Sequence, residues 1–569
     1  MNNSIKKSTY FLYFNLIFLT CLSFVFTNIG YDSEYQLAMA YRMVKGDALI
    51  TQMWEPHQTS AFLCAILMKL YIFITGTTTG IVLFTQFAGL FIRTGISLFL
   101  FKTVKEISGE IPALSAGLIF FLISPKDLLT PEFSNMQLWF GMLVLLTLTQ
   151  YLRKNNTLYL IMTAVWLCLG VFSYPSFIIT YAAVVIILYR YSVHKAKHIV
   201  AFTGVCALIG VSFVGCLMLR IDWATLVFCL DKALSLEPSH TVSLFQKLFD
   251  HFKNLAQIFG LLLLVCGIGF IIACIMNFIC NKRNPSMKSF SYTMWLLISW
   301  YILQFIFLFN ILSAENRGGY GIPLFCIIVF GFTKRKLLSE QETVFYNSAL
   351  GIGTMSLIST LLLSDHAFLL AIPYMLVTVC VSVLPLYRWF ETFKTKKHLA
   401  QMFTSAVHLF LLLNIFRALF IHVPMHGRGQ ICSVLDDLAL IRKGPAIGII
   451  TDEEGAARQR DSMAEWKQYV KPGDTIWLLG EPVDTLGYLY EDVEVGAPTV
   501  MSTPTYNNNL LYYWELNPEK YPDVVILSSS FGELSWDLLK NEWLLDWLET
   551  EYCADQVIDG NYWRYYIKD

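Results

Sequence analysis

Charge is scarce in this sequence. Only 15% of its 569 residues are charged and 56% are hydrophobic, whereas about a quarter of the residues of a soluble domain are charged. The mean hydropathy is +0.54, so most of the chain must lie in a lipid environment. With a net charge of −1, the chain also lacks the basic field that a nucleic-acid partner requires. The composition indicates a polytopic membrane protein and excludes nucleic-acid binding.

Cysteine is nearly absent outside the apolar stretches. Ten of the 13 cysteines lie in apolar runs, where cysteine behaves as a small hydrophobe. Cys432 and Cys553 lie outside those runs, and an oxidising compartment would allow them to form a disulfide. Spacing alone does not determine disulfide pairing, so the sequence leaves this open.

Long apolar stretches fill the chain from residue 9 to residue 421. The first, 9–29, follows Lys6 and Lys7 as in a signal sequence, but it is long for one and has no small-x-small cleavage site before Tyr31. We interpret it as an uncleaved first transmembrane helix. A helix needs about 20 apolar residues to cross the bilayer, and most later stretches approach that length.

Basic residues collect in alternate connections between these stretches. The positive-inside rule places such connections in the cytoplasm. The remaining connections, which include 30–58 and 219–255, are acidic, mixed or short and belong outside. The pattern predicts a multi-pass plasma-membrane protein with a cytoplasmic N-terminus. The basic segments are 1–7, 102–105, 153–154, 190–198, 282–288, 334–336 and 388–397.

One interval breaks this alternation. Between residue 58 and Lys102 the rule allows a single net crossing, yet two apolar stretches, 59–75 and 79–101, lie there. The shorter stretch is therefore expected to be a re-entrant or surface helix. The chain then has about thirteen transmembrane helices.

A change in composition near Ile421 marks a second domain. Charged residues become frequent and apolar runs shorten to strand length. This predicts an extracytoplasmic α/β domain over 422–569 beside a transmembrane domain over 1–421. The segment TDEEGAARQR lacks G-x-G spacing after the first strand, which argues against nucleotide binding. The expected strands are 446–451, 475–480 and 524–529, and the expected helices are 452–470 and 532–551.

Carboxylates cluster in the first external loop. Asp32, Glu34 and Asp47 lie there among aromatic residues. A single ionisable group at the membrane surface is ordinary, but several carboxylates in one outer loop beside aromatic residues call for a reason. Apolar spacing over 34–45 predicts a short amphipathic helix on the bilayer surface, ended by Gly46. Asp32 would then cap the helix N-terminus, an alternative to a catalytic role that the residues alone leave open.

Six residues of the stretch 31–70 carry a resemblance, in the order Asp32, Glu34, Tyr35, Gly46, Asp47 and Pro56. The stretch resembles the first external loop of the GT-C class of polyprenyl-phosphate-dependent glycosyltransferases, in the branch of aminoarabinose transferases and protein O-mannosyltransferases. The chain departs from that branch in two places. Ser33 separates the acidic residues, and Glu55-Pro56-His57 stands where a His-x-Pro-Pro turn is usual.

The resemblance implies a membrane glycosyltransferase with a GT-C-like fold. Its donor would be a polyprenyl-phosphate-linked sugar, and its acceptor a hydroxyl of a glycan, lipid or protein at the outer face. The lipid phosphate is already a good leaving group, so a single inverting displacement needs only a base that takes the proton of the acceptor hydroxyl. Asp32 is the expected base, with Glu34 as the alternative.

The departing lipid phosphate needs a neighbouring cation or hydrogen-bond donors. Arg317 stands in a glycine-rich external segment where its guanidinium can approach a phosphate bidentately. Acidic groups such as Glu132 could instead join Asp32 around a divalent metal ion, a cofactor that the resemblance leaves open. The expected substrate-binding residues are Tyr35, Asp47, Glu55, His57, Lys126, His240 and Arg317.

Two other classes of function remain open from the sequence. A transporter or flippase of lipid-linked sugars would also be polytopic, but transporters commonly show inverted repeats, and no internal repeat is visible in this chain. A non-catalytic envelope-assembly protein would bind through its external domain. Replacing Asp32 separates these readings, because only an enzyme loses sugar transfer.

Overall fold

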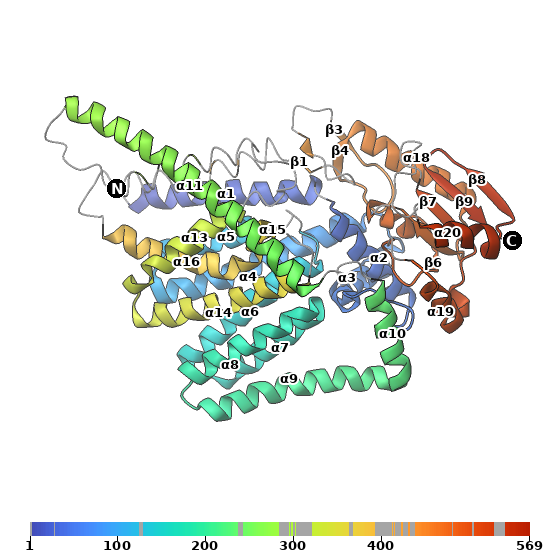
Figure 1. Cartoon of the computed structure of the whole chain (residues 1–569), viewed down its shortest axis with the longest axis horizontal. Helices are drawn as coiled ribbons and strands as arrows, with labels where there is room; N and C mark the ends of the chain where they lie inside the picture. The colour runs from blue at the N-terminus through green and yellow to red at the C-terminus, as the bar shows by residue number, and fades with distance from the viewer. Residues whose placement is uncertain are drawn as a thin grey trace.

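The fold is a helical bundle with an α/β unit at one end (Figure 1). The computed structural model describes residues 3–27, 29–123, 129–236, 243–283, 295, 298–299, 302, 321–363, 368–392, 412, 415, 423–424, 431–432, 438–480, 482–502, 506–528 and 541–568.

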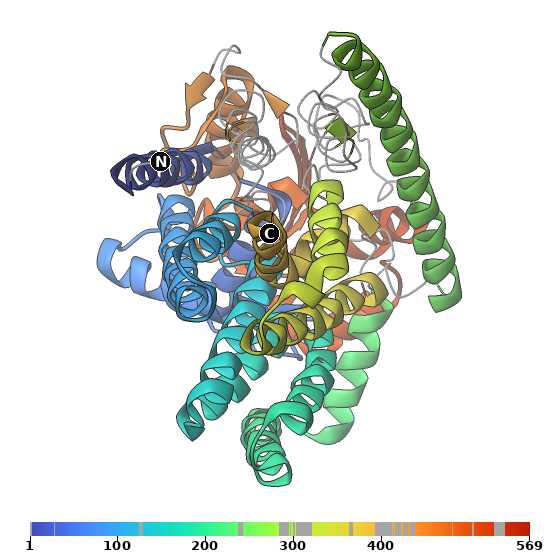
Figure 2. The same ribbon diagram turned by 90° about the vertical axis from the view of Figure 1, so that its left-hand side faces the viewer.

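Most of the bundle consists of long apolar helices. The longest, α11, lies along the edge of the bundle when the molecule is seen from the end opposite the α/β unit (Figure 2). The bundle helices are α1 (Asn3–Thr27), α4 (Ile81–Ser108), α5 (Glu110–Leu122), α6 (Phe133–Lys154), α7 (Thr157–Ser173), α8 (Thr180–Tyr191), α9 (Lys195–Met218), α11 (Leu244–Arg283), α13 (Gly321–Lys334), α14 (Glu340–Leu363) and α16 (Leu376–Glu391).

Shorter helices gather where the bundle meets the α/β unit. Two of them, α2 and α3, lie between the bundle and that unit in Figure 1. The short helices and single turns are α2 (Tyr31–Lys45), η1 (Gln58–Ser60), α3 (Ala61–Thr75), η3 (Pro175–Ile179), α10 (Trp223–Ser235), η5 (Arg335–Leu337), α15 (Phe368–Ala371) and η6 (Ile372–Met375).

Six helices in the described part of the chain are long and apolar enough to cross a membrane. A seventh crossing results if the bent pair Asn15–Thr27 and Asp32–Lys45 counts as one span. The expected number of about thirteen spans is not confirmed. Two of the expected stretches, 289–312 and 400–421, lie largely outside the described residues.

Two of the connections expected to be basic, together with the N-terminus, lie at one end of the bundle (Figure 1). The α6–α7 and α8–α9 connections lie at the end away from the α/β unit, as does the N-terminus (Figure 1). This arrangement follows the predicted alternation of basic and non-basic connections. Which end faces the cytoplasm stays a prediction.

Both ends of α3 lie near the α/β unit. Just before α3, the Thr59 hydroxyl donates to the Phe172 carbonyl at the close of α7 (2.5 Å). Just after α3, the Thr78 hydroxyl donates to the Leu489 carbonyl of the α/β unit (2.9 Å), and the Gly80 N–H donates to the Gly444 carbonyl (3.2 Å). Although α3 is apolar enough to span a membrane, the chain is tied to the bundle end that carries the α/β unit on both sides of this helix. Whether α3 is a re-entrant or surface helix stays a prediction.

The C-terminal unit contains a five-stranded mixed sheet of order β6-β5-β7-β9-β8. Strand β5 pairs in parallel with β6 and β7, and β9 pairs antiparallel with β7 and β8. Two small antiparallel pairs, β1–β2 and β3–β4, precede the sheet. The elements are β1 (Val423–Pro424), β2 (Ile431–Cys432), β3 (Leu438–Leu440), β4 (Ile450–Asp452), α18 (Glu453–Tyr469), β5 (Thr475–Leu479), η8 (Pro482–Leu489), β6 (Glu494–Val495), α19 (Asn509–Leu516), η9 (Pro518–Lys520), β7 (Val524–Ser528), α20 (Glu542–Trp547), η11 (Leu548–Tyr552), β8 (Gln556–Asp559) and β9 (Trp563–Ile567).

The predicted α/β elements are confirmed in part. The strands expected at 475–480 and 524–529 and the helix expected at 452–470 are present within a residue or two as β5, β7 and α18. The expected strand 446–451 is largely wrong. Gly448 adopts a φ of +88°, a left-handed conformation that does not occur within a regular strand. Only the last two residues of the segment pair in β4.

Helix 532–551 is confirmed only in its later half, as α20 and the π turn that follows it, because 529–540 lie outside the described residues. Cys553 follows this turn as a free, exposed thiol, so the disulfide considered for Cys432 and Cys553 is not formed.

The expected amphipathic surface helix 34–45 is a helix, but it does not lie on a surface. Residues 33–42 of α2 are all buried. Its apolar residues, including Leu37 and Met39, share a hydrophobic core with Trp477 and Val525 of the α/β unit. The sequence pattern shows that one face of α2 is polar, but not that the α/β unit packs against this helix.

Candidate functional site

The candidate catalytic carboxylates lie in the first turn of α2. The helix begins at Tyr31 after an N-cap at Gly30, so Asp32 is not the N-cap residue that the sequence left as an alternative. An acidic residue in the first turn is common in helices, because unpaired backbone N–H groups give the helix N-terminus a partial positive charge. Gly46 ends the helix with a φ of +106°, as expected.

Asp32 and Glu34 differ in their access to solvent. The Glu34 side chain is completely buried, whereas Asp32 is partly exposed. A group that accepts a proton from an incoming hydroxyl must come within hydrogen-bonding distance of it. Asp32 is therefore the better placed of the two to meet an acceptor.

Other polar residues approach the first turn of α2 from the bundle. Asp32 and Glu132 both lie within electrostatic range of the Tyr374 hydroxyl, on the short turn η6. Glu132 is the N-cap residue of α6, where its carboxylate accepts the N–H groups of Ser134 (2.7 Å) and Asn135 (2.6 Å). Elements far apart in sequence thus bring two carboxylates and a phenol together at the end of the bundle that carries the α/β unit.

The His57 ring packs against two aromatic rings, which also contact each other (6.2 Å between centroids). It stacks on Phe133 (4.7 Å between centroids) and on Tyr174 (5.2 Å). Tyr174 also lies within electrostatic range of Tyr374. The stack therefore links the predicted residue His57 to the surroundings of Asp32. Tyr35 is buried on α2, and a role for either residue in substrate binding stays a prediction.

Asp47 and Glu55 are engaged in ion pairs with one buried arginine. The Arg42 guanidinium lies 2.7 Å from Asp47 and 3.2 Å from Glu55, and all three side chains are almost inaccessible to solvent. Arg42 also donates to the carbonyl of Pro498 in the α/β unit (3.1 Å). These contacts give both carboxylates a structural role, and their predicted role in substrate binding stays untested.

Contacts from the α/β unit complete the surroundings of Arg42. The Val500 N–H donates to Glu55 (2.9 Å), and the Tyr513 hydroxyl donates to the Gln52 carbonyl (2.9 Å) while accepting from Arg42 (3.2 Å). Burial raises the pKa of Tyr513 above its ordinary value, so the hydroxyl remains a donor. Nothing in the sequence indicated that Arg42 would join the two carboxylates to the α/β unit.

Three predicted binding residues lie outside the described residues: Lys126, His240 and Arg317. Their proposed contacts with a phosphate stay predictions.

The described residues do not form an obvious metal site. Among them, no group of three or more His, Cys, Asp or Glu side chains is arranged to hold a metal ion. Both Glu132 oxygens already accept backbone N–H groups. The divalent metal ion considered for Asp32 and Glu132 stays a prediction.

Sequence reasoning missed the aromatic part of the site. Tyr374 follows Pro373, and Tyr174 precedes Pro175, each at the end of an apolar stretch. Tyrosine at such positions ordinarily belongs to a membrane-interface belt, so nothing in the sequence separates these two from the others.

The bundle, the α/β unit at one end and the carboxylates between them define an α-helical membrane protein with a candidate site at the junction of its two parts. No family model and no curated protein matches the sequence. Two solved structures are similar to 91% of this chain. One is the archaeal oligosaccharyltransferase AglB from Archaeoglobus fulgidus in complex with an inhibitory peptide and a dolichol-phosphate, with 11% identity, 70% of that chain covered and a TM-score of 0.42. The other is the Archaeoglobus fulgidus oligosaccharyltransferase in the apo form, with 12% identity, 69% covered and a TM-score of 0.44. Values this low do not establish family membership or activity.

Proposed function

We propose that the chain is a membrane glycosyltransferase that moves a sugar from a polyprenyl-phosphate donor to an acceptor hydroxyl at the outer face. The observation that carries the proposal is the placement of Asp32. This partly exposed carboxylate lies in the first turn of an otherwise buried helix, at the bundle end that carries the α/β unit. The resemblance of residues 31–70 to GT-C enzymes supports the same assignment.

The proposed reaction is a single displacement at the anomeric carbon. The acceptor oxygen attacks this carbon while Asp32 takes the hydroxyl proton. The bond from the anomeric carbon to the phosphate oxygen breaks, and its electron pair leaves with the polyprenyl phosphate. The anomeric configuration inverts because attack and departure occur on opposite faces. A positioned base contributes about 10²–10⁴-fold to such a rate.

The remaining residues have supporting roles in this proposal. Tyr374, which lies within electrostatic range of both Asp32 and Glu132, would help to orient the acceptor. In the cluster of His57, Phe133 and Tyr174, the half-buried rings of His57 and Phe133 are the ones that a sugar could contact. Arg317 and Lys126 stay the predicted partners of the departing phosphate.

Transfer by the purified chain in liposomes tests the proposal. Sugar donors carrying a radiolabel would be supplied as a polyprenyl phosphate or as a nucleotide sugar, together with an extract of envelope glycans, lipids and proteins. The proposal expects label to reach the acceptor only from the lipid donor. Mass spectrometry of surface glycans from cells with and without the gene then identifies the product.

Movement of intact lipid-linked sugar across the bilayer without transfer would instead identify a flippase. Absence of both activities, with glycans unchanged in cells, would favour an assembly protein. Either result contradicts the proposed function.

A further inference from the structure

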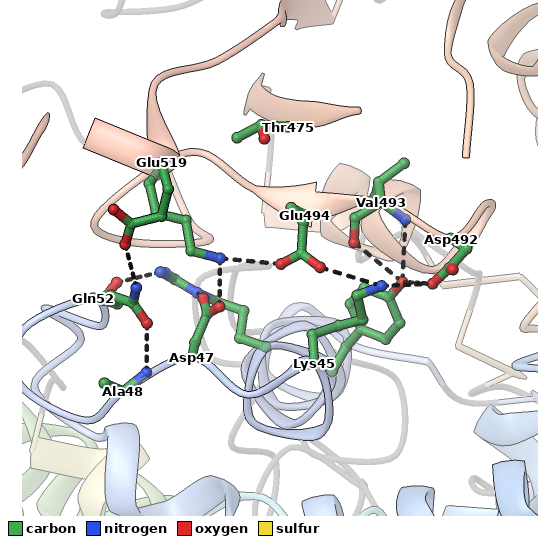
Figure 3. A network of polar contacts seen from close by, with 12 residues as sticks. Lys45, Asp47, Ala48, Gln52, Thr475, Asp492, Val493, Glu494 and Glu519 are labelled. Atoms are coloured by element: carbon green, nitrogen blue, oxygen red, sulfur yellow. Dashed lines mark hydrogen bonds and ion pairs between the residues drawn. The ribbon is translucent and has the colours of Figure 1, made fainter. Parts of the chain in front are cut away.

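Ion pairs join the end of α2 to the α/β unit (Figure 3). Lys45 lies 2.7 Å from Asp492 and 3.2 Å from Glu494, and the Val493 N–H donates to the Tyr41 hydroxyl (3.2 Å). The end of α2 and the segment 492–494, which are more than 400 residues apart in sequence, therefore lie side by side.

Lys520 links this contact to the loop that follows α2. Its ammonium group lies 2.5 Å from Asp47 and 3.1 Å from Glu494, so it bridges the loop and strand β6. Only 6% of its side chain is exposed. Nearby, the Gln52 amide donates to Glu519 (2.7 Å) and its oxygen accepts the Ala48 N–H (2.7 Å), which fixes the same loop a second time.

The buried centre of this network is electrically balanced. Two cations, Arg42 and Lys520, face two anions, Asp47 and Glu55, and all four side chains are almost fully buried. A buried ion is tolerated only where an opposite charge and hydrogen bonds replace water. Removal of Lys520 would leave Asp47 to share Arg42 with Glu55, and the loop would lose its one buried cation from the α/β unit among the described residues.

Two residues of this network are connected to residues of the candidate site through a short stretch of backbone. Glu55 stands two residues before His57, whose ring is fixed in the aromatic stack. Arg42 lies on the same helix as Asp32, ten residues further along, or about 15 Å of rigid helix. A shift of the loop or of the end of α2 is therefore passed to both residues.

We propose that Lys520 is a positioning residue. Through its ion pair with Asp47, the α/β unit holds the loop 46–58 and the end of α2 in place, and this sets the positions of Asp32 and His57. The effect on catalysis rests on the proposed function, whereas the effect on the loop does not. The α/β unit then acts as a clamp, in the sense that it holds the loop 46–58 in one position relative to the site. A misplacement of about 1 Å at a reacting group lowers rates by about 10²-fold.

Hydrogen–deuterium exchange and transfer kinetics of the full chain test this proposal together. Lys520→Met removes the charge and keeps much of the side-chain volume, and Lys520→Arg keeps the charge. Glu494→Gln is a milder change, because Glu494 is partly exposed and lies on the outer side of the same lysine. Lys467→Gln is the matched control, since it breaks an exposed pair with Glu491 within the α/β unit.

In Lys520→Met we expect faster exchange confined to residues 46–58 and a fall in kcat of about 10–100-fold, because Asp32 and His57 leave their productive positions. Lys520→Arg should restore most of kcat, Glu494→Gln should show a smaller effect in the same direction, and Lys467→Gln should match the unmodified protein.

Three results would overturn the proposal. The first is unchanged exchange over 46–58 in Lys520→Met. The second is faster exchange spread evenly over β5, β7 and β9, because Lys520 would then hold the sheet rather than the loop. The third is faster loop exchange with unchanged kcat. If the unmodified chain itself transfers no sugar, the proposed function fails, while exchange confined to the loop would still support the clamp.

Discussion

Burial, rather than distance, should decide which ion pairs at the α2 junction stabilise the protein. Lys45 and Asp492 are closer (2.7 Å) than Arg42 and Glu55 (3.2 Å). Asp492 is 72% exposed, however, whereas Arg42 and Glu55 are completely buried. The comparison therefore sets a short exposed pair against a longer buried pair within one network.

The expected magnitudes differ severalfold. Breaking a buried pair by removing one partner costs about 3–5 kcal/mol, because a charge is left without compensation. Glu55→Gln should fall near the lower end, about 3 kcal/mol, because Asp47 still faces Arg42. An exposed pair contributes about 0–1 kcal/mol, so Asp492→Asn should fall within that range.

The free energy of unfolding, measured by titration of the purified protein with SDS in mixed micelles, checks these values. Raising the salt concentration should reduce the small effect of Asp492→Asn and leave that of Glu55→Gln nearly unchanged, because buried pairs are screened much less. An Asp492→Asn variant that loses as much stability as Glu55→Gln would refute the reasoning.

Three further predictions follow from single positions. A membrane-impermeant maleimide should label the exposed thiol of Cys553 in intact cells, and Cys553→Ser should remove the label; labelling only after lysis would contradict the extracytoplasmic placement of the α/β unit. Gly46→Ala should lower the free energy of unfolding by about 1–2 kcal/mol through backbone strain alone, since the φ of Gly46 is +106° and no atom lies near the added methyl. Gly46→Asn should lower the free energy of unfolding by less, and an equal loss of stability in both variants would contradict this cause. Hydrogen bonds from the Thr225 N–H and hydroxyl lower the pKa of Asp222 at the start of α10. The Asp222 cap should therefore stabilise α10 above pH 3.8, the ordinary pKa of the group, and this stability should be lost as the pH falls through the lower pKa of the folded protein. Amide exchange in α10, corrected for intrinsic rates, should show this loss, and Asp222→Asn should abolish the pH dependence.

The sequence was informative wherever local pattern decides the structure. Apolar length identified the bundle helices, strand-length runs identified β5 and β7, and Gly46 marked the end of α2. Each of these features depends on neighbours within a few residues or on a rule about the membrane.

The rest depended on contacts between distant segments. The polar residues of α2 looked suited to water, because the sequence cannot reveal that Arg42 and Lys45 contact an α/β unit more than 400 residues away. Asp47 and Glu55 looked like substrate ligands for the same reason, since their partners Arg42 and Lys520 are recognised only once the chain is folded. The approach of Tyr174, Glu132 and Asp32 to Tyr374 likewise arises from packing.

The most direct test of the central claim is the rate of sugar transfer by Asp32→Asn in liposomes. Asn keeps the shape of the side chain but is a far weaker base, so the account predicts a fall in kcat of about 10²–10⁴-fold with unchanged abundance and unchanged exchange over α2. Asp461→Asn, which alters an exposed carboxylate of the α/β unit, should transfer at the normal rate. Normal transfer by Asp32→Asn would contradict the account.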